Sequence, residues 1–566
     1  MESFDYVIVG SGAAGSVLAA RLCAEHGVTV CVLEAGPSDW HPWLHIPAGF
    51  IKVLGDSRFT WPFSSEASAM TGNRRIPLPQ GRTLGGSTAI NGMVYNRGQA
   101  EDFDQWEAAG NEGWGFESVL PYFKKTETRI GFADEGFAGR AGPLTITRAD
   151  WQSPLCEAFI QGAQELGIPR NGDYNGATQI GAGYFQRTIS GGLRKSAASA
   201  FLRQPIKKNQ NLRVIFNAQA TEVIIENHKA VGVRYVNGES AASITQIRAR
   251  KEVILCAGTI NTPKLLQLSG VGDGKFLSEL GIPVKSHLEG VGSNLRDHLA
   301  IRVVAQTSGV QTINELSRLP MLAWEAAKWV FQRPNILSLS PSLVHWFWDS
   351  TRSGSRPDIQ GVFSPASYKE GSVGQLDQTS GMTCGLWQHR PKSSGFVKLS
   401  STHFFDSPVV QPNYLSEEHD RNVLLAGLRM ARRLLNTSAL SPYRPQESLP
   451  GADRQSDEEL LAYVREYCTS SYHLVGTARM GPKINRDSVV DSQLRVYGVE
   501  ALRVVDASIM PNIPSANTCA ATMMIAEKAA EMIIRPRKSP EEHSAVASQR
   551  LEDKYMAETS KEDSKS

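Results

Sequence analysis

The sequence predicts an α/β protein, α+β overall, in which a dinucleotide-binding domain is interleaved with a second domain. The second domain is expected to be built on an antiparallel sheet with flanking helices. Three observations support this prediction: a strand–turn–helix–strand pattern at the N-terminus, glycine-rich segments far along the chain, and stretches of helical and strand periodicity in the second half.

The N-terminal pattern has the form of a Rossmann-like βαβ unit. The aromatic and β-branched residues 6–9 precede a Gly-x-Gly-x-x-Gly turn, a helical run and a second apolar strand that ends in an acid. In such a unit Gly10 permits the tight turn, Gly12 lets the backbone approach a pyrophosphate, and Gly15 lets the helix pack close to the strand. The helix N-terminus would face the phosphates, and the acid would accept the ribose hydroxyls. The residues predicted to bind the nucleotide are Gly10, Ser11, Gly12, Ala13, Ala14, Gly15, Glu34 and Ala35.

The two domains are expected to alternate along the chain. The nucleotide-binding domain is predicted to comprise residues 1–150, 195–310 and 469–536, with strands near 212–216 and 221–225. The chain should therefore leave this domain twice and return to it at its C-terminal end.

The second domain, which we expect to bind the substrate, is predicted to comprise residues 151–194 and 311–468. Helical spacing over 319–331 and 423–435 predicts two of its helices, and period-two alternation over 395–399 predicts a strand of its antiparallel sheet. Such a sheet would form a firm wall for a pocket.

The composition is that of a large protein without a bias toward nucleic acid. A chain of 566 residues with 41% hydrophobic content can bury a substantial core. Its 59 basic and 57 acidic residues give a net charge of +2, which argues against a nucleic-acid partner. Residues 537–566 are rich in Lys, Glu, Ser and Ala, so we expect a disordered tail there.

Cysteine usage and hydropathy predict the compartment. The seven cysteines lack Cys-x-x-Cys spacing, which indicates reduced thiols and argues against a metal site. The first strand begins within about four residues of the N-terminus, so no signal peptide is expected. No apolar stretch approaches the ~20 residues of a membrane span. We therefore expect a cytoplasmic protein, with peripheral contact with the inner membrane left open and the oligomeric state not readable.

Later motifs indicate which nucleotide is bound. The glycine-rich segments 81–92 and 258–272 resemble the two signature segments of the glucose–methanol–choline (GMC) family of flavoproteins, which bind FAD through such an N-terminal unit. Segments 291–298, 471–481 and 505–528 are similar to further blocks of that family, in the family's order. The resemblance covers about residues 4 to 535 and implies an FAD-dependent oxidoreductase similar to bacterial alcohol, sorbose, polyethylene glycol and choline dehydrogenases.

The resemblance also implies where FAD lies. Val223 is expected to meet the adenine through its backbone, and Asp506 and Ala507 to lie along the ribityl chain and diphosphate. Some relatives attach FAD through a histidine at the position of Ile90, so we expect non-covalent FAD here. The other residues implied to contact FAD are Arg82, Gly85, Gly86, Ser87, Asn91, Gly92, Met93, Val94, Ala257, Gly258, Asn517 and Thr518.

Alcohol oxidation by a flavin requires a base near the hydroxyl and a neighbour that fixes its direction. His473 matches the histidine that acts as base in the family, and Asn517 occupies the partner position, where relatives carry histidine or asparagine. Because an amide cannot accept a proton at neutral pH, His473 would be the sole base. We also expect Asn517 to cap the following helix, whose start would point N–H groups at the flavin pyrimidine.

The residues of the predicted substrate-binding domain favour a neutral alcohol as the substrate. Relatives that oxidise choline hold its ammonium with a carboxylate, and the matching stretch 336–348 contains no acid, so choline is disfavoured. A neutral primary alcohol or polyol is the expected donor. Aromatic side chains expected to line its pocket are Trp61, Trp346, Trp348 and Tyr472, with His345, Phe347 and Trp387 as further candidates.

Several alternatives remain open at this stage. The electron acceptor could be a quinone or dye, as for a dehydrogenase, or O2, as for an oxidase, and the resemblance favours the dehydrogenase. Relatives of the same fold include flavin-containing lyases of cyanohydrins and light-driven decarboxylases of long-chain acids. A nicotinamide-linked enzyme is disfavoured, because it would leave the two later glycine-rich segments without a role.

Overall fold

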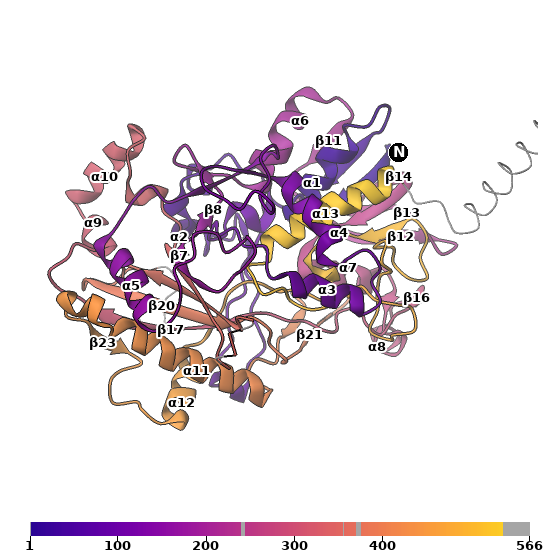
Figure 1. The fold of residues 1–566 in the computed structure, drawn as a ribbon. Helices are drawn as coiled ribbons and strands as arrows, with labels where there is room; N and C mark the ends of the chain where they lie inside the picture. Colours follow the sequence, from indigo (N-terminus) through magenta and orange to yellow (C-terminus); the bar gives the residue numbers. More distant parts are fainter. Residues whose placement is uncertain (1, 239–243, 352, 355, 370–374, 536–566) are drawn as a thin grey trace, which may run out of the picture.

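The computed structural model describes residues 2–238, 244–351, 353–354, 356–369 and 375–535. The predicted tail, 537–566, lies outside these residues. Figure 1 shows two lobes, each built on one large sheet, with the chain crossing between them.

The first lobe carries the N-terminal βαβ unit in a seven-stranded sheet of order β11-β2-β1-β14-β13-β12, with β25 against β14. β1 pairs in parallel with β2 and β14, and β2 with β11, whereas β12 and β13 are antiparallel. The residues of β2 are buried throughout, as expected of a strand covered on both faces. The strands are β1 (Ser3–Val9), β2 (Val30–Leu33), β11 (Leu212–Ile215), β12 (Ala218–Glu226), β13 (Lys229–Asn237), β14 (Ile244–Leu255) and β25 (Leu502–Val504).

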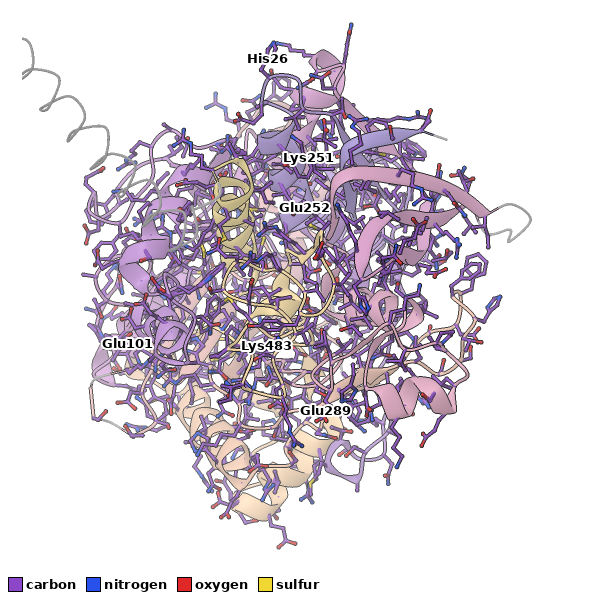
Figure 2. The ribbon with its side chains drawn as sticks, turned by 90° about the vertical axis from the view of Figure 1, so that its right-hand side faces the viewer. His26, Glu101, Lys251, Glu252, Glu289 and Lys483 are labelled. Atoms are coloured by element: carbon purple, nitrogen blue, oxygen red, sulfur yellow. The ribbon has the colours of Figure 1, made fainter. Side chains whose placement is uncertain are left out.

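Helices from both ends of the chain pack together on this sheet. α1 (Ala13–Leu22) lies beside α13 (Cys519–Ile534), and α4 (Phe116–Thr126) contacts α13 (Figure 1). Glu527 is fully buried between them and accepts from Arg21 Nη2 at 2.6 Å and Lys125 Nζ at 3.2 Å. A second ion pair joins β25 to β14, from Arg503 Nε to Glu252 Oε2 at 2.7 Å; Glu252 is labelled in Figure 2. The C-terminal return of the chain is therefore held to the nucleotide-binding sheet.

The second lobe is an antiparallel sheet of order β23-β17-β20-β19-β18-β7, with β24 against β17. α11 (Glu418–Leu435) and α5 (Pro154–Glu165) pack together on one face. Met382, Cys384 and Leu386 of β20 belong to the core on that face, so alternate residues point the other way. The strands are β7 (Gly181–Tyr184), β17 (Leu299–Gln306), β18 (Val344–Trp348), β19 (Ile359–Ser364), β20 (Gly381–Gln388), β23 (Gln446–Leu449) and β24 (Thr469–Ser470).

Shorter elements connect and cover the two sheets. The helices are α2 (Phe50–Val53), α3 (Ala100–Ala108), α6 (Arg203–Lys208), α7 (Gly258–Leu268), α8 (Gly274–Glu279), α9 (Ile313–Leu316), α10 (Met321–Val330) and α12 (Asp457–Tyr467). The strands are β3 (Thr60–Trp61), β4 (Gln80–Gly81), β5 (Glu127–Arg129), β6 (Leu144–Arg148), β8 (Gln186–Arg187), β9 (Ile189–Ser190), β10 (Leu193–Arg194), β15 (Val271–Gly272), β16 (Ser286–His287), β21 (Phe396–Lys398) and β22 (Val409–Gln411).

Two strands differ from the predicted division of the chain. β17 and β24 fall in ranges assigned to the nucleotide-binding domain, yet both belong to the second sheet, where β17 pairs with β20 and β24 pairs with β17. The predicted strand at 395–399 forms as β21, but it pairs only with β22 and does not join the large antiparallel sheet. Period-two alternation identifies a strand without naming its partner, so the sequence could not assign these strands to a sheet.

The described residues contain no helix long and apolar enough to cross a bilayer and no cluster of three or more metal-ligating side chains. All seven cysteines are free thiols, and six of them are buried.

Replacing Gly15 by alanine should destabilise the first lobe. An added Cβ would lie 2.0 Å from the carbonyl oxygen of Gly10, a main-chain atom that cannot move aside. We expect Gly15→Ala to lower the free energy of unfolding by about 1–3 kcal/mol, as overpacking does, measured as a lower Tm. Gly55→Ala is the control, because an added Cβ there meets no neighbouring atom within 4 Å. An unchanged Tm for Gly15→Ala would show that the helix does not need this close approach.

Candidate active site

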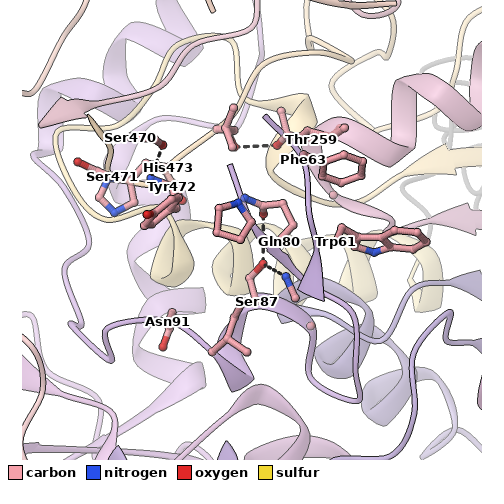
Figure 3. Close-up of a pocket in the computed structure, with 18 of the residues that line it drawn as sticks. Trp61, Phe63, Gln80, Ser87, Asn91, Thr259, Ser470, Ser471, Tyr472 and His473 are labelled. Atoms are coloured by element: carbon pink, nitrogen blue, oxygen red, sulfur yellow. Dashed lines mark hydrogen bonds between the residues drawn. The ribbon is translucent and has the colours of Figure 1, made fainter. Parts of the chain in front are cut away.

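A cavity of about 900 Å³ lies between the two sheets. One end is formed by the turn after β1, the end of β2 and the start of α7, and the other by the face of the second sheet opposite its helix-covered core. Figure 3 shows His473 and Tyr472 on one side of this cavity, Trp61 and Phe63 on the other, and Asn91 and Ser87 below them. The cavity therefore joins the predicted nucleotide-binding and substrate-binding parts of the chain.

The glycine turn forms the nucleotide end of the cavity. The main-chain N–H and the Oγ of Ser11 donate to Glu34 Oε2 at 3.0 and 2.5 Å, and Gly36 N–H donates to Glu34 Oε1 at 2.8 Å. Burial raises the pKa of Glu34, while these hydrogen bonds lower it. Gly12 occupies the N-cap position of α1. Because glycine has no side chain, the first N–H groups of the helix have no side-chain acceptor at the N-cap residue.

The second glycine-rich segment lies against this turn. Gly85 and Gly86 have φ of 91° and 52°, and an added Cβ at Gly86 would lie 2.7 Å from Gly12 Cα. Ser87 Oγ accepts from Gly81 N–H at 3.0 Å, a contact drawn in Figure 3. Asn91 Oδ1 accepts from Arg194 Nη1 at 2.8 Å and from Met93 N–H at 3.0 Å. Side chains are thus excluded where the two glycine turns meet.

These features fit a dinucleotide. The uncapped start of α1 offers N–H groups and a partial positive charge to a pyrophosphate, and the glycine contact leaves the backbone bare beside it. Asp506 also lines the cavity. Its two carboxylate oxygens accept from Gly258 N–H at 2.9 Å and from Ser508 N–H at 2.8 Å. Asp506 therefore fixes the start of α7 beside the cavity.

His473 is presented by a turn that a buried carboxylate holds in place. Asp297 Oδ1 accepts from the His473 N–H at 2.8 Å, and Asp297 Oδ2 accepts from Ser470 Oγ and Tyr414 OH at 2.5 Å each. Burial raises the pKa of Asp297 to about 6 against the opposing effect of these hydrogen bonds. Tyr472, between the two bonded residues, has φ of 62°. The carboxylate thus sets the turn that aims the imidazole into the cavity.

A directed chain of hydrogen bonds passes through His473. His298 Nε2 lies 2.8 Å from the main-chain oxygen of His389, which can only accept, so this nitrogen carries the proton. His298 Nδ1 must then accept from His473 Nδ1–H at 3.0 Å when both rings are neutral. His473 Nε2 is left with a lone pair, which accepts from Asn517 Nδ2 at 3.0 Å. Asn517 Oδ1 in turn accepts from Gln360 Nε2 at 3.1 Å.

Burial keeps this chain neutral. Desolvation holds the pKa of His473 well below its usual 6.5, and the neighbouring His298 lowers it further. Desolvation also lowers the pKa of His298 to about 4. Both rings are therefore uncharged at neutral pH, and His473 Nε2 can accept a proton from a group in the cavity.

Asn517 does not cap the helix as predicted. α13 begins at Cys519 with Thr518 at its N-cap, and no side chain there caps the helix. The Asn517 amide is instead held between His473 and Gln360, which orients its NH2 group toward the imidazole. Thr518 and Cys519 line the cavity, so the start of α13 borders it as expected.

The substrate end is largely apolar and aromatic. Trp61 stacks on Phe63 with ring centroids 5.9 Å apart, and the Trp387 ring lies 5.6 Å from that of His473. Thr383, Gly385 and Trp387 point into the cavity from β20, on the face opposite its core residues. Among the described lining residues the acids are Glu34 and Asp506 at the nucleotide end and Glu466, whose side chain is more than half exposed.

Two predicted pocket residues lie elsewhere. Trp346 and Trp348 share the face of β18 that packs on the core of the second lobe, and Trp346 is fully buried there. His345 and Phe347 point to the other face but pack against Tyr174 and do not line the cavity. Their aromatic character predicted a pocket, whereas the side of the strand that faces it depends on the tertiary structure.

Most predicted nucleotide-binding residues line the cavity: Gly10, Ser11, Gly12, Ala13, Ala14, Glu34, Ala35, Gly86, Ser87, Asn91, Gly92, Met93, Val94, Ala257, Gly258, Asp506, Ala507, Asn517 and Thr518. Gly15, Arg82, Gly85 and Val223 are outside this lining. The Val223 N–H donates to Ser269 Oγ at 2.8 Å, and the wall near it is formed by Ala218, Gln219 and Ala220. Arg82 stacks over the Trp61 ring at 4.9 Å.

The residues that orient the imidazole were not among the predicted site residues. His298 and Asp297 lie in segment 291–298, which was noted only as a similar block, and Gln360 had no signal at all. Arg74, Tyr467 and Ser470 also line the cavity without having been predicted.

Comparison with known proteins gives consistent matches. Family models described as GMC oxidoreductase match residues 4–300 and 391–526. The chain is 39% identical over 533 residues to an oxygen-dependent choline dehydrogenase of Rhizobium johnstonii, covering 94% of this chain and 95% of the relative. It is also 39% identical to an alcohol dehydrogenase [acceptor] of Pseudomonas putida, covering 94% of this chain and 96% of the relative.

Solved structures of the same fold include a pyridoxine 4-oxidase from Mesorbium loti, with a TM-score of 0.85, 29% identity and coverage of 94% and 100% of the two chains. An FAD-dependent oxidoreductase from Chaetomium thermophilum matches with a TM-score of 0.86, 26% identity and coverage of 94% and 99%.

Proposed function

This chain belongs to the GMC oxidoreductase family, and from that premise we propose that it oxidises a neutral primary alcohol to the carbonyl compound with His473 as the base. Membership confirms the predicted FAD cofactor and an oxidoreductase acting on CH–OH donors. The observation that carries the proposal is the neutral, directed hydrogen-bond chain that leaves the Nε2 lone pair of His473 at the cavity.

FAD, when bound, supplies the hydride acceptor. The residues that line the nucleotide end would hold it, with the start of α1 at the pyrophosphate and Glu34 at the ribose. Ile90 stands where a linking histidine would be needed, so we propose that FAD is not covalently attached at that position.

His473 and Asn517 have different roles at the substrate hydroxyl group: one accepts its proton and the other donates a hydrogen bond to its oxygen. When the alcohol binds, its O–H takes the place of Asn517 Nδ2 as the donor to His473 Nε2. Asn517 Nδ2 then donates to the alcohol oxygen instead, where negative charge develops as the proton leaves. His473 Nδ1–H keeps its bond to His298, so the ring does not rotate as its Nε2 gains the proton. The buried position of His473, which is 8% exposed, limits competition from water for Nε2.

The lining supports a neutral alcohol with an apolar body. Trp61, Phe63, Ile76 and Trp387 offer dispersion contacts but few partners for the extra hydroxyls of a polyol. Choline is the second candidate, because a relative at 39% identity is named choline dehydrogenase and aromatic rings can hold a quaternary ammonium. No acid of the described lining lies beside the aromatic wall except the exposed Glu466, which favours the neutral donor.

An anaerobic alcohol panel tests the proposed function. Primary alcohols with apolar chains should bleach the flavin band faster than polyols or choline, and a quinone dye should reoxidise the flavin faster than air. Acid precipitation of the same preparation should leave FAD in the supernatant, because no covalent bond holds it. Preference for choline, or absence of bleaching by any alcohol, would overturn the proposed substrate class; fast reoxidation by air would identify an oxidase.

Substitution of the two polar residues should separate their roles. His473→Ala should slow flavin reduction by about 10²–10⁴-fold, the usual loss on removing a general base. Asn517→Ala should cost about 1.5–3 kcal/mol, roughly 10- to 150-fold, because one hydrogen bond to the developing alkoxide is lost. Both variants should keep FAD.

The pH dependence checks this assignment. Because the pKa of His473 is well below 6.5, its neutral form predominates above that pH, and kcat/KM should be level around neutrality and fall only under more acidic conditions. The acid limb should persist in Asn517→Ala and disappear in His473→Ala, whose rate should rise with pH as hydroxide takes the proton. Equal losses with the limb abolished in both variants would mean that the base is misassigned.

His298 should act as a positioning residue for His473. His298→Leu removes the acceptor of His473 Nδ1–H and should slow flavin reduction by about 10–100-fold, a usual loss for a supporting contact. Its acid limb should move to higher pH, because His298 contributes to the lowered pKa of His473 after desolvation. His298→Gln can both accept from His473 and donate to the His389 carbonyl, so it should restore most of the rate. If the acid limb of kcat/KM stays at the same pH in His298→Leu, His298 contributes only packing and does not position His473.

A further inference from the structure

The segment around α10 exposes large apolar side chains. Leu319 is 79% exposed, Trp324 64%, Val330 67% and Phe331 76%, and Met321 is 41% exposed. Figure 1 shows α9 and α10 at the periphery of the molecule. Isolated exposed apolar residues are ordinary, whereas a contiguous group of this size on one helix marks a contact surface.

These side chains share one face of the helix. Positions 323, 327 and 330 follow one another at helical spacing, 324 and 331 lie beside them, and the exposed Leu319 lies just before the helix begins at Met321. The opposite face carries the one acid of the helix: Glu325 is 1% exposed, accepts from Lys328 Nζ at 2.6 Å and accepts from the Ile336 N–H at 2.9 Å. Trp329 Nε1 donates to the Gly192 oxygen at 3.0 Å on the inner side. The helix is thus anchored by polar contacts inward and presents its apolar face outward.

The charges that accompany this face are positive. Residues 318–333 contain Arg318, Lys328 and Arg333. Lys328 pairs with the buried acid Glu325, so the net positive charge of this segment comes from Arg318 and Arg333. A two-fold contact between copies of this chain would bring these cations toward each other, since both copies use the same patch. An anionic surface would attract them.

Two neighbouring segments connect α10 to the wall of the cavity. The segment after α10 packs against residues 47–49, which lead into α2. Phe50 and Leu54, at the two ends of α2, line the cavity, and Ile51 between them is exposed. Pro341 and Ser342, eleven and twelve residues after Val330, also line the cavity. A surface bound at α10 would therefore be connected through these segments to residues that line the cavity.

We propose that α10 docks this protein on the headgroup region of an anionic lipid bilayer. Leu319, Trp324, Val330 and Phe331 enter the boundary between headgroups and acyl chains, and Arg318 and Arg333 at the two ends of the helix face lipid phosphates. In this arrangement the protein lies on the membrane surface. Apolar substrates or acceptors dissolved in the bilayer then have a short path to the cavity.

Vesicle flotation of the full-length, FAD-loaded protein tests this inference. Vesicles of phosphatidylcholine with about 30% phosphatidylglycerol should carry the protein upward at low salt, and vesicles of phosphatidylcholine alone should carry less, because the electrostatic attraction is missing. Trp324→Ser combined with Phe331→Ser should weaken vesicle binding about tenfold or more, since the two aromatic side chains that would enter the bilayer are lost. Neither residue lines the cavity, so flavin content and activity with a short soluble alcohol should be unchanged.

A matched variant controls for loss of exposed apolar area in general. Phe132 is 70% exposed and Ile484 89%, and both lie outside residues 318–333, so Phe132→Ser combined with Ile484→Ser should leave flotation unchanged. The proposal fails if the unsubstituted protein does not float with anionic vesicles, or if both double variants lose binding equally. It also fails if light scattering shows a dimer that the α10 variant dissociates while flotation is absent, because the face would then pair two copies.

Discussion

The hydrogen bond from His298 to the main-chain carbonyl of His389 is the contact on which the polarity of the site depends. A carbonyl oxygen can only accept, so it decides which nitrogen of His298 is protonated, and through His298 it decides the tautomer of His473. The amide of Asn517 is oriented by the same chain. A proton-accepting nitrogen at the cavity thus follows from one main-chain group in the second lobe, without a carboxylate partner for the imidazole.

Burial makes this arrangement effective. The cavity lies between two sheets, and the surrounding protein penalises charge strongly enough to keep His473 and His298 neutral near pH 7. Charge that develops on a substrate oxygen in such a site is felt strongly by nearby donors, because little water screens it. Asp297, held by Ser470, Tyr414 and the His473 N–H, adds rigidity to the turn itself. Desolvation and positioning therefore support the same chemistry.

The interleaved chain explains how two lobes form one site. β17 begins directly after His298, and β24 ends shortly before His473, both in the second sheet. Asn517 precedes α13 on the first sheet. The ion pairs of Glu527 with Arg21 and Lys125 hold α13 to the N-terminal unit, so the amide and the nucleotide end belong to one rigid layer. At the outer edge of the molecule, α10 buries its acid, Glu325, and exposes its apolar face, the reverse of what is usual for a surface helix. The segment that follows α10 continues to residues of the cavity wall.

The sequence by itself determined the features that depend on local sterics and periodicity. The glycines of the first turn, the βαβ unit and helices near 319–331 and 423–435 could be predicted in this way, whereas His473 and Asn517 were predicted as site residues from the resemblance to the family. Only the tertiary structure decided which face of β18 meets the cavity, which sheet receives β17, and that Asn517 orients His473 instead of capping α13. His298 and His473 are 175 residues apart, and Gln360 and Asn517 are 157 apart. Periodicity shows that a helix or strand has two faces, whereas the choice of partner for each face is made by segments distant in the chain, as it is for the outward apolar face of α10.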